Sequence, residues 1–183
     1  MPFNHPFWES NTSPDETLLS ETRRLHRLRR ADRYTCLCAY ALDQLLAGRM
    51  ELPRETALIT ASAFGPSATS FQTVMDIFDV PAEEISPTIF SHSVHNAANA
   101  YLGIAFDLHG PAYALTGFNK SLRSNALELA EAIVKSGDAP AALVVAIEAD
   151  SIVTDAASVC YPEKFPTKFH ERLYAALIGP SSN

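Results

Sequence analysis

The sequence has few cysteines and no long apolar run, and both shortages narrow the class of protein. Three cysteines in 183 residues are an odd count, and Cys36 and Cys38 lie too close along the chain to bridge each other well, so no disulfide framework is predicted. A C-x-C pair without a second pair or a nearby histidine is a weak metal signal, so we predict neither a metal nor a cofactor. No apolar run reaches about 18 residues, which excludes an ordinary membrane-spanning helix.

The sequence also lacks an excess of positive charge and a secretory leader. With 14 Lys and Arg against 21 Asp and Glu, the net charge is -7, which argues against a general nucleic-acid-binding protein. Residues 1–16 lack the basic-then-apolar order of a signal peptide, so we expect a cytoplasmic protein. Hydrophobic residues make up 47% of the chain, which is enough for one ordinary core.

Half of the positive charge lies near the N-terminus. Ser13 as a cap, followed by Pro14 in the first turn, predicts a helix that runs to about Arg30. Basic side chains dominate its surface: Arg23, Arg24, Arg27, Arg29 and Arg30. A solvated basic face is the simplest interpretation, and docking of an acidic partner by Arg23, Arg27 and Arg30 is the alternative. We therefore divide the chain into an N-terminal arm with a basic helix, residues 1–33, and a domain, residues 34–183.

Helical and strand patterns alternate along the rest of the chain. The apolar spacing predicts helices over residues 34–46, 67–78, 91–106 and 121–136, and strands over residues 56–61, 113–116, 141–147 and 173–178. Weak periodicity and two prolines predict a long loop over residues 149–169. Strands that alternate with helices indicate parallel pairing.

Residues 86–113 are the most informative segment. They contain Ser86-Pro87, then Asn96 followed by small residues, then an apolar helix, and then Gly110-Pro111 before an aromatic residue that leads a strand into a helix. This order resembles the amino-terminal half of the β-ketoacyl-acyl-carrier-protein synthases, members of the thiolase superfamily. The resemblance is good over residues 33–150 and absent before residue 14. The run Ser-Val-His-Asn at residues 93–96 is similar to a signature of short ketosynthase-like proteins of aryl polyene and polyketide biosynthesis.

The resemblance implies an α/β fold that is half of a thiolase-like fold. We expect a mixed, mostly parallel sheet of about five strands with helices on both faces. The usual first strand has no visible counterpart, so one sheet edge should be open or covered by the N-terminal arm. Ketosynthases dimerise through the strand that precedes the nucleophile, which implies an interface with a complete ketosynthase or a second copy. Its residues here are Ala112, Tyr113, Ala114, Leu115 and Thr116, with Asn96 on the neighbouring helix.

The resemblance also implies where a nucleophile would lie. In active ketosynthases the strand after Gly-Pro-aromatic turns and presents a cysteine at a helix start, where free N–H groups favour the thiolate. Counting from Gly110-Pro111 places Asn119 at that position, and an amide accepts no acyl group. A helix cap is the simplest interpretation of Asn119. The two catalytic histidines of these enzymes belong to the second thiolase half, which we do not expect here, so we assign no catalytic residue.

Three functional hypotheses follow. The first is a non-catalytic subunit that acts beside a complete ketosynthase, as chain length factors do. The second is an acyl-carrier-protein-dependent acyltransferase or hydrolase that uses Ser93 or Ser121 with His92 or His95, although neither serine lies in a glycine-flanked elbow. The third is a carrier-protein docking module, in which the arginines of residues 23–33 meet the acidic surface of an acyl carrier protein.

Overall fold

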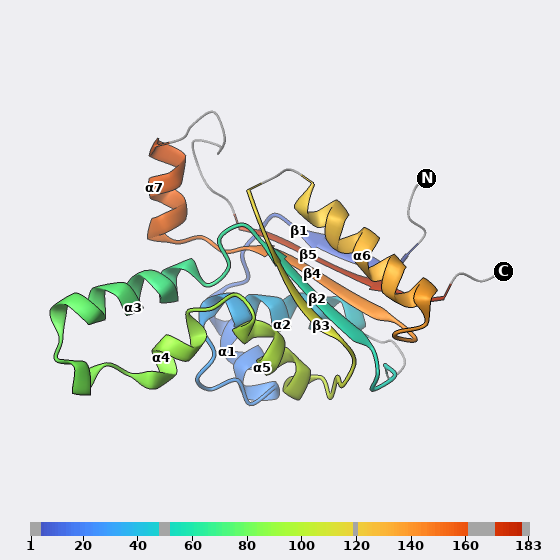
Figure 1. Ribbon diagram of the computed structural model, residues 1–183, viewed down its shortest axis with the longest axis horizontal. Coiled ribbons are helices and arrows are strands. Elements are labelled where there is room, and N and C mark those ends of the chain that lie inside the picture. Colours follow the sequence, from blue (N-terminus) through green and yellow to red (C-terminus); the bar gives the residue numbers. More distant parts are fainter. Residues whose placement is uncertain (1–4, 48–51, 119–120, 161–170, 181–183) are drawn as a thin grey trace.

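The computed structural model describes residues 5–47, 52–118, 121–160 and 171–180 (Figure 1). Thirteen elements follow one another in these residues: β1 (Phe7–Ser10), α1 (Glu16–Leu25), α2 (Arg33–Leu46), β2 (Ala57–Ser62), α3 (Ser67–Asp79), η1 (Ala82–Glu84), α4 (Pro87–His92), α5 (Ala97–Ala105), β3 (Ala112–Thr116), α6 (Leu122–Ser136), β4 (Ala142–Glu148), α7 (Ile152–Cys160) and β5 (Arg172–Ile178). None of the helices described is long and apolar enough to cross a membrane.

One five-stranded sheet forms the centre of the fold, in the order β1-β5-β4-β2-β3. Strand β2 pairs in parallel with β3 and with β4, whereas β5 is antiparallel to both β4 and β1. All six residues of β2 are buried, which explains its continuous apolar run in the sequence. The expected mixed α/β fold with five strands is confirmed.

Helices cover both faces of the sheet, as expected (Figure 1). On one face, α1, α2 and α5 enclose a core that includes Leu19, Leu37 and Leu102. On the opposite face, α6 packs alone over β2 and β4, and Ile59 and Val144 lie in this second core. Helices α3 and α4 extend away from the sheet, with α7 above α3 (Figure 1). The α6 face therefore leaves more of the sheet accessible than the α2 face does.

The first helix is shorter than predicted. Its N-cap is Asp15 rather than Ser13, because the Asp15 carboxylate accepts a hydrogen bond from Leu18 N at 2.9 Å. The helix ends at Leu25, and Arg27 follows with a φ of 57°. Arg27, Arg29 and Arg30 consequently lie on a loop rather than on a helix face.

The expectation that the usual first strand has no counterpart in this chain is wrong. Strand β1 pairs with β5 from Phe7 opposite Ala176 to Ser10 opposite Leu173. Trp8 packs edge-on against Tyr40 of α2, with ring centroids 5.9 Å apart, whereas Phe7 is 60% exposed. Four residues give too short an alternation to be recognised as a strand. The arm therefore covers one sheet edge, and the domain boundary at residue 33 stays a prediction.

Two other element predictions are wrong. The single helix predicted over residues 91–106 is two helices, α4 and α5. Helix α4 begins earlier because Ser86 caps it, accepting from Ile89 N at 3.4 Å, and Pro87 fits its first turn. The loop predicted over residues 149–169 contains α7, which starts at a turn where Ser151 Oγ accepts from Thr154 N at 3.2 Å. Residues 161–170 of that prediction lie outside the described residues.

Candidate functional site

The parallel strands β2, β3 and β4 end at the same edge of the sheet, and their connections to the following helices meet there. Glu148, at the end of β4, holds the loop that follows β2. Its carboxylate accepts hydrogen bonds from Ala63 N at 2.6 Å, Phe64 N at 3.3 Å and the Ser62 hydroxyl at 3.0 Å. Burial raises the pKa of Glu148, and these hydrogen bonds oppose the rise. Glu148 therefore anchors this loop.

His95 lies against the same loop. The residue it faces is Gly65, with φ at +52°, and a Cβ added there would lie 2.6 Å from His95 Cδ2 and 2.8 Å from His95 Nε2. Only glycine fits at this position, because a side chain would both strain the backbone and overlap the imidazole. On its other side, His95 Nε2 lies 3.3 Å from Thr116 Oγ1 at the end of β3. Burial lowers the pKa of His95, which keeps the ring neutral at pH 7.

The predicted nucleophile position, Asn119, lies outside the described residues. The elements that flank it are in place: β3 ends at Thr116 and α6 begins at Leu122, with Ser121 as its N-cap residue. Phe118 is 70% exposed, and its ring meets Phe64 edge-on at 5.3 Å between centroids. A parallel strand thus ends at Thr116 and a helix begins at Leu122, on either side of the predicted nucleophile position.

The serines and histidines of the hydrolase hypothesis have other described contacts. Ser93 Oγ donates to Phe90 O at 2.7 Å. His92 is buried and stacks on Tyr101, whose hydroxyl lies 2.8 Å from His92 Nε2. Because His95 contacts Thr116, both histidines meet a hydroxyl group other than that of Ser93. The use of Ser121 in such a pair stays a prediction.

The strand of the predicted interface is the outermost strand of the sheet. Strand β3 pairs with β2 on one side only, so its other edge faces away from the sheet. Ala112, Tyr113 and Thr116 are exposed, and Tyr113 retains 44% of its accessible surface. Asn96 is exposed at the start of α5, beside this strand. The structure therefore brings the predicted interface residues to one accessible edge.

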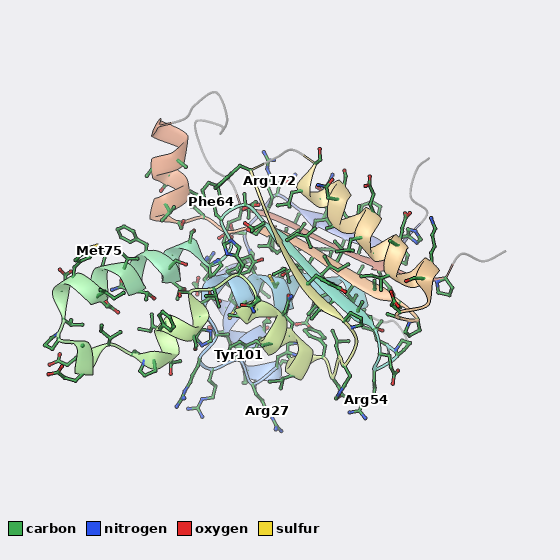
Figure 2. The ribbon with its side chains drawn as sticks, in the orientation of Figure 1. Arg27, Arg54, Phe64, Met75, Tyr101 and Arg172 are labelled. Atoms are coloured by element: carbon green, nitrogen blue, oxygen red, sulfur yellow. The ribbon has the colours of Figure 1, made fainter. Side chains whose placement is uncertain are left out.

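The three arginines predicted to dock an acidic partner have different surroundings. Arg23 is engaged within the fold, since its Nε donates to Cys36 Sγ at 3.2 Å and its Nη1 lies 3.8 Å from Glu16 Oε2. Arg27 and Arg30 are exposed, and Arg27 points away from the body of the molecule (Figure 2). Arg23 is therefore partly exposed and engaged within the fold, whereas Arg27 and Arg30 are exposed.

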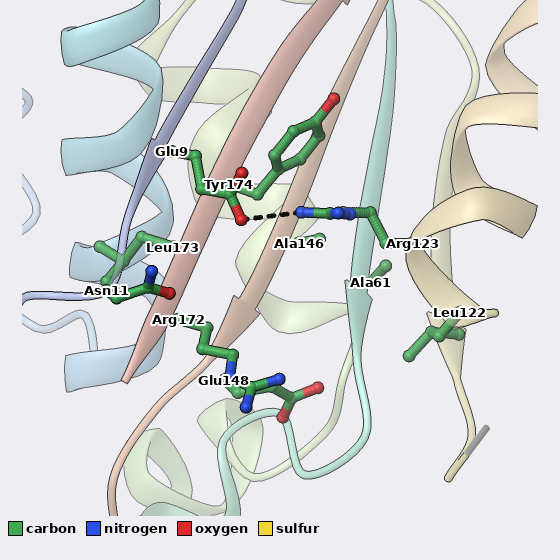
Figure 3. A pocket seen from close by; sticks show the side chains of 10 residues that line it. All are labelled: Glu9, Asn11, Ala61, Leu122, Arg123, Ala146, Glu148, Arg172, Leu173 and Tyr174. Atoms are coloured by element: carbon green, nitrogen blue, oxygen red, sulfur yellow. Dashed lines mark hydrogen bonds and ion pairs between the residues drawn. The ribbon is translucent and has the colours of Figure 1, made fainter. Parts of the chain in front are cut away.

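A cleft of about 760 Å³ lies beside the start of α6, on the face of the sheet that α6 covers (Figure 3). Its lining comes from β1, β2, β4, β5 and α6: Glu9, Asn11, Ala61, Leu122, Arg123, Ala146, Glu148, Arg172, Leu173 and Tyr174. Arg123 Nη1 donates to Glu9 Oε1 at 2.9 Å, and its guanidinium lies 4.8 Å from the centre of the Tyr174 ring. The sequence did not predict this cleft, because five segments far apart in the chain form it and no local spacing of residues indicates it.

The cysteine pair is buried in α2, and both side chains are inaccessible to solvent. Burial raises the pKa of the Cys36 and Cys38 thiols, which keeps both protonated and unreactive at neutral pH. Within the described ranges, no group of three or more His, Cys, Asp or Glu side chains is placed to hold a metal ion.

A comparison with models of protein families identifies one family. Residues 4–156 match the family model described as "Beta-ketoacyl synthase, N-terminal domain", so the prediction of no resemblance before residue 14 is wrong. No curated protein matches this sequence.

Solved structures share the fold at low sequence identity. "The ishigamide ketosynthase/chain length factor" is similar with a TM-score of 0.73 and 19% identity, over 84% of this chain and 45% of that one. "Ketosynthase (ApeO) in Complex with its Chain Length Factor (ApeC) from Xenorhabdus doucetiae" gives a TM-score of 0.68 and 18% identity, over 95% of this chain and 67% of that one. A β-ketoacyl synthase from Burkholderia phymatum STM815 gives a TM-score of 0.62 and 13% identity, over 92% and 46%.

The chain spans about half the length of the ishigamide and Burkholderia proteins. The family match, in contrast, covers far more than half of this chain, and it includes β1 to β4 of the sheet. The five-stranded mixed sheet with helices on both faces is the thiolase-like architecture that these structures share. The chain therefore belongs to the β-ketoacyl synthase family, which it matches over the N-terminal domain.

Proposed function

We propose that this chain is a non-catalytic ketosynthase-like subunit that pairs with a second chain of its family in polyketide or aryl polyene biosynthesis. In this role it resembles a chain length factor. The observation that carries the proposal is the open edge of β3. The sequence adds Asn119, which stands where the resemblance leads us to expect the nucleophilic cysteine.

The chemistry of the junction supports a role without covalent catalysis. A carboxamide has no lone pair comparable in nucleophilicity to a thiolate, so Asn119 cannot accept an acyl chain as a cysteine does. Cys36 and Cys38 are buried and protonated, and therefore do not replace it. His95 at the same edge is neutral and contacts a threonine hydroxyl. Asn119, the buried cysteines and His95 therefore suit a structural role better than covalent catalysis.

The edge of β3 supports pairing with another chain. An exposed edge strand offers a row of backbone N–H and C=O groups, which proteins normally protect from unspecific association. Tyr113 is partly exposed on this strand, and Ile104 on the neighbouring α5 is 85% exposed. A partner that extends the sheet would satisfy the backbone groups and cover both side chains.

Co-expression with a complete ketosynthase from the same biosynthetic gene group tests the pairing. We expect a one-to-one complex by size-exclusion chromatography with light scattering. Replacing Ala114 by proline should abolish it, because proline removes the central N–H of the edge and is held to a φ of about −65°. Alanine 132, exposed on α6, offers a control site at which a charged substitution should leave the complex intact.

An activity assay separates this proposal from the hydrolase or acyltransferase alternative. The purified chain is incubated with acylated carrier protein, and its intact mass is measured. We expect no stable acyl adduct and no condensation product. An adduct that disappears on replacement of Ser93 or Ser121 by alanine would overturn the non-catalytic role and favour the alternative.

The exposed arginines support docking of an acyl carrier protein as an additional role. Arg27 and Arg30 are exposed and lie after α1, near Leu25, which is 71% exposed. Cationic groups around an exposed apolar side chain suit an acidic protein surface, and their attraction accelerates encounter at low salt. Exchanging Arg27 and Arg30 for glutamate should weaken carrier-protein binding at low salt, whereas the same exchange at Arg54 and Lys135 should not. Equal binding by both double variants would remove the docking role.

A further inference from the structure

Helix α3 carries an apolar stripe that the rest of the described chain leaves exposed. Its four side chains follow helical spacing and therefore lie on one face of the helix: Phe71, Val74, Met75 and Phe78. All four are exposed, and Phe78 retains 79% of its accessible surface. Helices α4 and α7 pack against α3 but do not cover this stripe. Clustered apolar side chains on a surface are typical of a contact with another molecule.

The surroundings of the α3 stripe are acidic. Residues 55–119 contain no lysine or arginine. Three exposed carboxylates follow the stripe along the chain and form its acidic rim: Asp79, Glu83 and Glu84. None of the three forms an ion pair within the part of the chain that the structure describes. An apolar stripe with uncompensated negative charge suits a basic surface that also carries an apolar side chain.

The same chain carries a surface of this kind in residues 24–30, the basic loop. Leu25 is 71% exposed there, among four exposed arginines: Arg24, Arg27, Arg29 and Arg30. Among the described residues, these arginines have no carboxylate within ion-pair distance. Figure 2 shows Met75 of the stripe and Arg27 of the loop at well-separated places on the molecule. The two complementary surfaces therefore do not meet within one chain.

We propose that a second copy of this chain docks its basic loop on the α3 stripe, with Leu25 packed on the stripe and the arginines facing the acidic rim. The contact joins two different surfaces of the same chain, so the copies associate head to tail. Charge complementarity favours a second copy over an anionic membrane or a nucleic acid, because the acidic rim repels both. The contact does not use the edge of β3. The inference therefore goes beyond the proposed function and does not depend on it.

Salt dependence gives the first test. The contact joins exposed charges, whose interactions are screened beyond about 10 Å at 0.1 M salt. In sedimentation equilibrium at about 50 mM salt, we expect the mean mass of the chain to rise with protein concentration up to about 100 µM. Raising the salt to about 0.5 M should raise the dissociation constant at least 10-fold. An association that this change of salt leaves unaltered would contradict the charge contact.

Charge reversal tests which surfaces meet. Arg27→Glu with Arg30→Glu reverses the basic loop, and Glu83→Lys with Glu84→Lys reverses the acidic rim. Each double variant alone should raise the dissociation constant at least 10-fold, because groups of like charge then face each other. An equal mixture of the two should associate again, because the reversed loop of one variant meets the reversed rim of the other. A mixture that stays monomeric, or a double variant that associates like the parent, would overturn the contact.

Matched controls separate this contact from an effect of net charge. Arg54→Glu with Lys135→Glu changes the net charge as the loop variant does, and Glu55→Lys with Glu128→Lys changes it as the rim variant does. All four side chains are exposed and lie outside both surfaces. The control variants should associate like the parent. If they lose association as the loop and rim variants do, net charge and not the proposed contact governs it.

The apolar part of the contact is tested at one exposed phenylalanine. Phe78→Ser removes most of an exposed ring and should leave folding intact, yet it should raise the dissociation constant at least 5-fold. Ile104→Ser is the matched control, since Ile104 is 85% exposed on α5 beside the edge of β3. Neither Ile104→Ser nor Ala114→Pro should weaken this association. Loss of association in these two variants but not in Phe78→Ser would place the contact at β3 and refute the inference.

The outcomes also separate this inference from the proposed function. A parent chain that stays monomeric at about 100 µM and low salt, but pairs with a ketosynthase, refutes the head-to-tail contact and leaves the proposed function standing. Head-to-tail association without any complex with a ketosynthase refutes the proposed function instead. Absence of both complexes refutes both.

Discussion

Replacing Gly65 by alanine should destabilise the protein by a mechanism that a second substitution can reverse in part. Gly65 sits in the left-handed region, at φ +52°, and its missing Cβ leaves the space that the His95 ring fills. Two costs therefore arise in Gly65→Ala: backbone strain, and displacement of His95 from the loop and from Thr116.

The contacts give the size of each cost. An alanine in the left-handed region costs about 1–2 kcal/mol relative to a right-handed one. A Cβ 2.6 Å from His95 Cδ2 is far inside van der Waals contact, so the ring must move. Moving it breaks the 3.3 Å contact with Thr116 Oγ1, a hydrogen bond whose net contribution is about 0.5–1.5 kcal/mol. Together these terms predict a loss of about 1.5–3.5 kcal/mol in the free energy of unfolding.

Urea unfolding of four proteins measures the two costs separately: the parent chain, G65A, H95A and the double variant. In the H95A background the added methyl group meets no ring, so the Gly65→Ala step should cost only the backbone strain, about 1–2 kcal/mol. The coupling energy between the two sites is then the lost His95 contact, about 0.5–1.5 kcal/mol. If Gly65→Ala costs the same in both backgrounds, the His95 ring does not limit this position and the argument fails.

Three further outcomes are expected. Arg33→Ala should lower the free energy of unfolding in urea by about 2–3 kcal/mol, because it leaves the buried Glu171 carboxylate without its bidentate partner. The cost is smaller than for a fully buried pair because the Arg33 side chain is 35% exposed. A similar cost for Arg29→Ala would contradict this reasoning. Tyr101→Phe should cost about 1–2 kcal/mol by removing the hydroxyl 2.8 Å from His92 Nε2, while Tyr40→Phe should be near neutral, and equal effects would argue against the buried pair. The pKa of Glu148 is raised in the folded state, so its contribution to folding stability is present below the ordinary pKa of a glutamate and is lost as the pH rises through the raised value. Between pH 4 and pH 7, the free energy of unfolding should therefore fall more in the parent protein than in Glu148→Gln. Parallel curves for the two proteins would refute the raised pKa of Glu148.

The long elements could be predicted from the sequence because their signals are local. The buried run of β2 is continuous, and α2 keeps helical spacing from Arg33 to Leu46 after Asp32, whose carboxylate caps it. The Gly110-Pro111 segment before β3 also gave the family correctly. Two of the misses involve short elements: β1 has four residues, and the break between α4 and α5 depends on the cap at Ser86. Short elements are fixed by their tertiary neighbours rather than by their own periodicity.

The candidate site divides in the same way. The interface strand and the strand-to-helix junction around residue 119 could be located by counting from one motif, since both lie within ten residues of Pro111. The hydrogen bonds of Glu148 could not be located in this way, because its carboxylate accepts them from a loop 84 to 86 positions earlier in the chain. The buried Asn99 Oδ1, which accepts no hydrogen bond from the described residues, could not be identified from the sequence either, since only the packing of α5 on the sheet decides whether a donor reaches it.

The sequence by itself determined the family, the alternation of strands and helices, and the identity of Asn119, because motif order and residue type need no partner to be read. The tertiary structure alone decided which strand lies outermost, that the N-terminal arm closes the opposite edge of the sheet, and that His95 fills the space above Gly65. These features depend on contacts between residues far apart in the chain, whose pairing is selected by burial of the whole core and not by any local pattern.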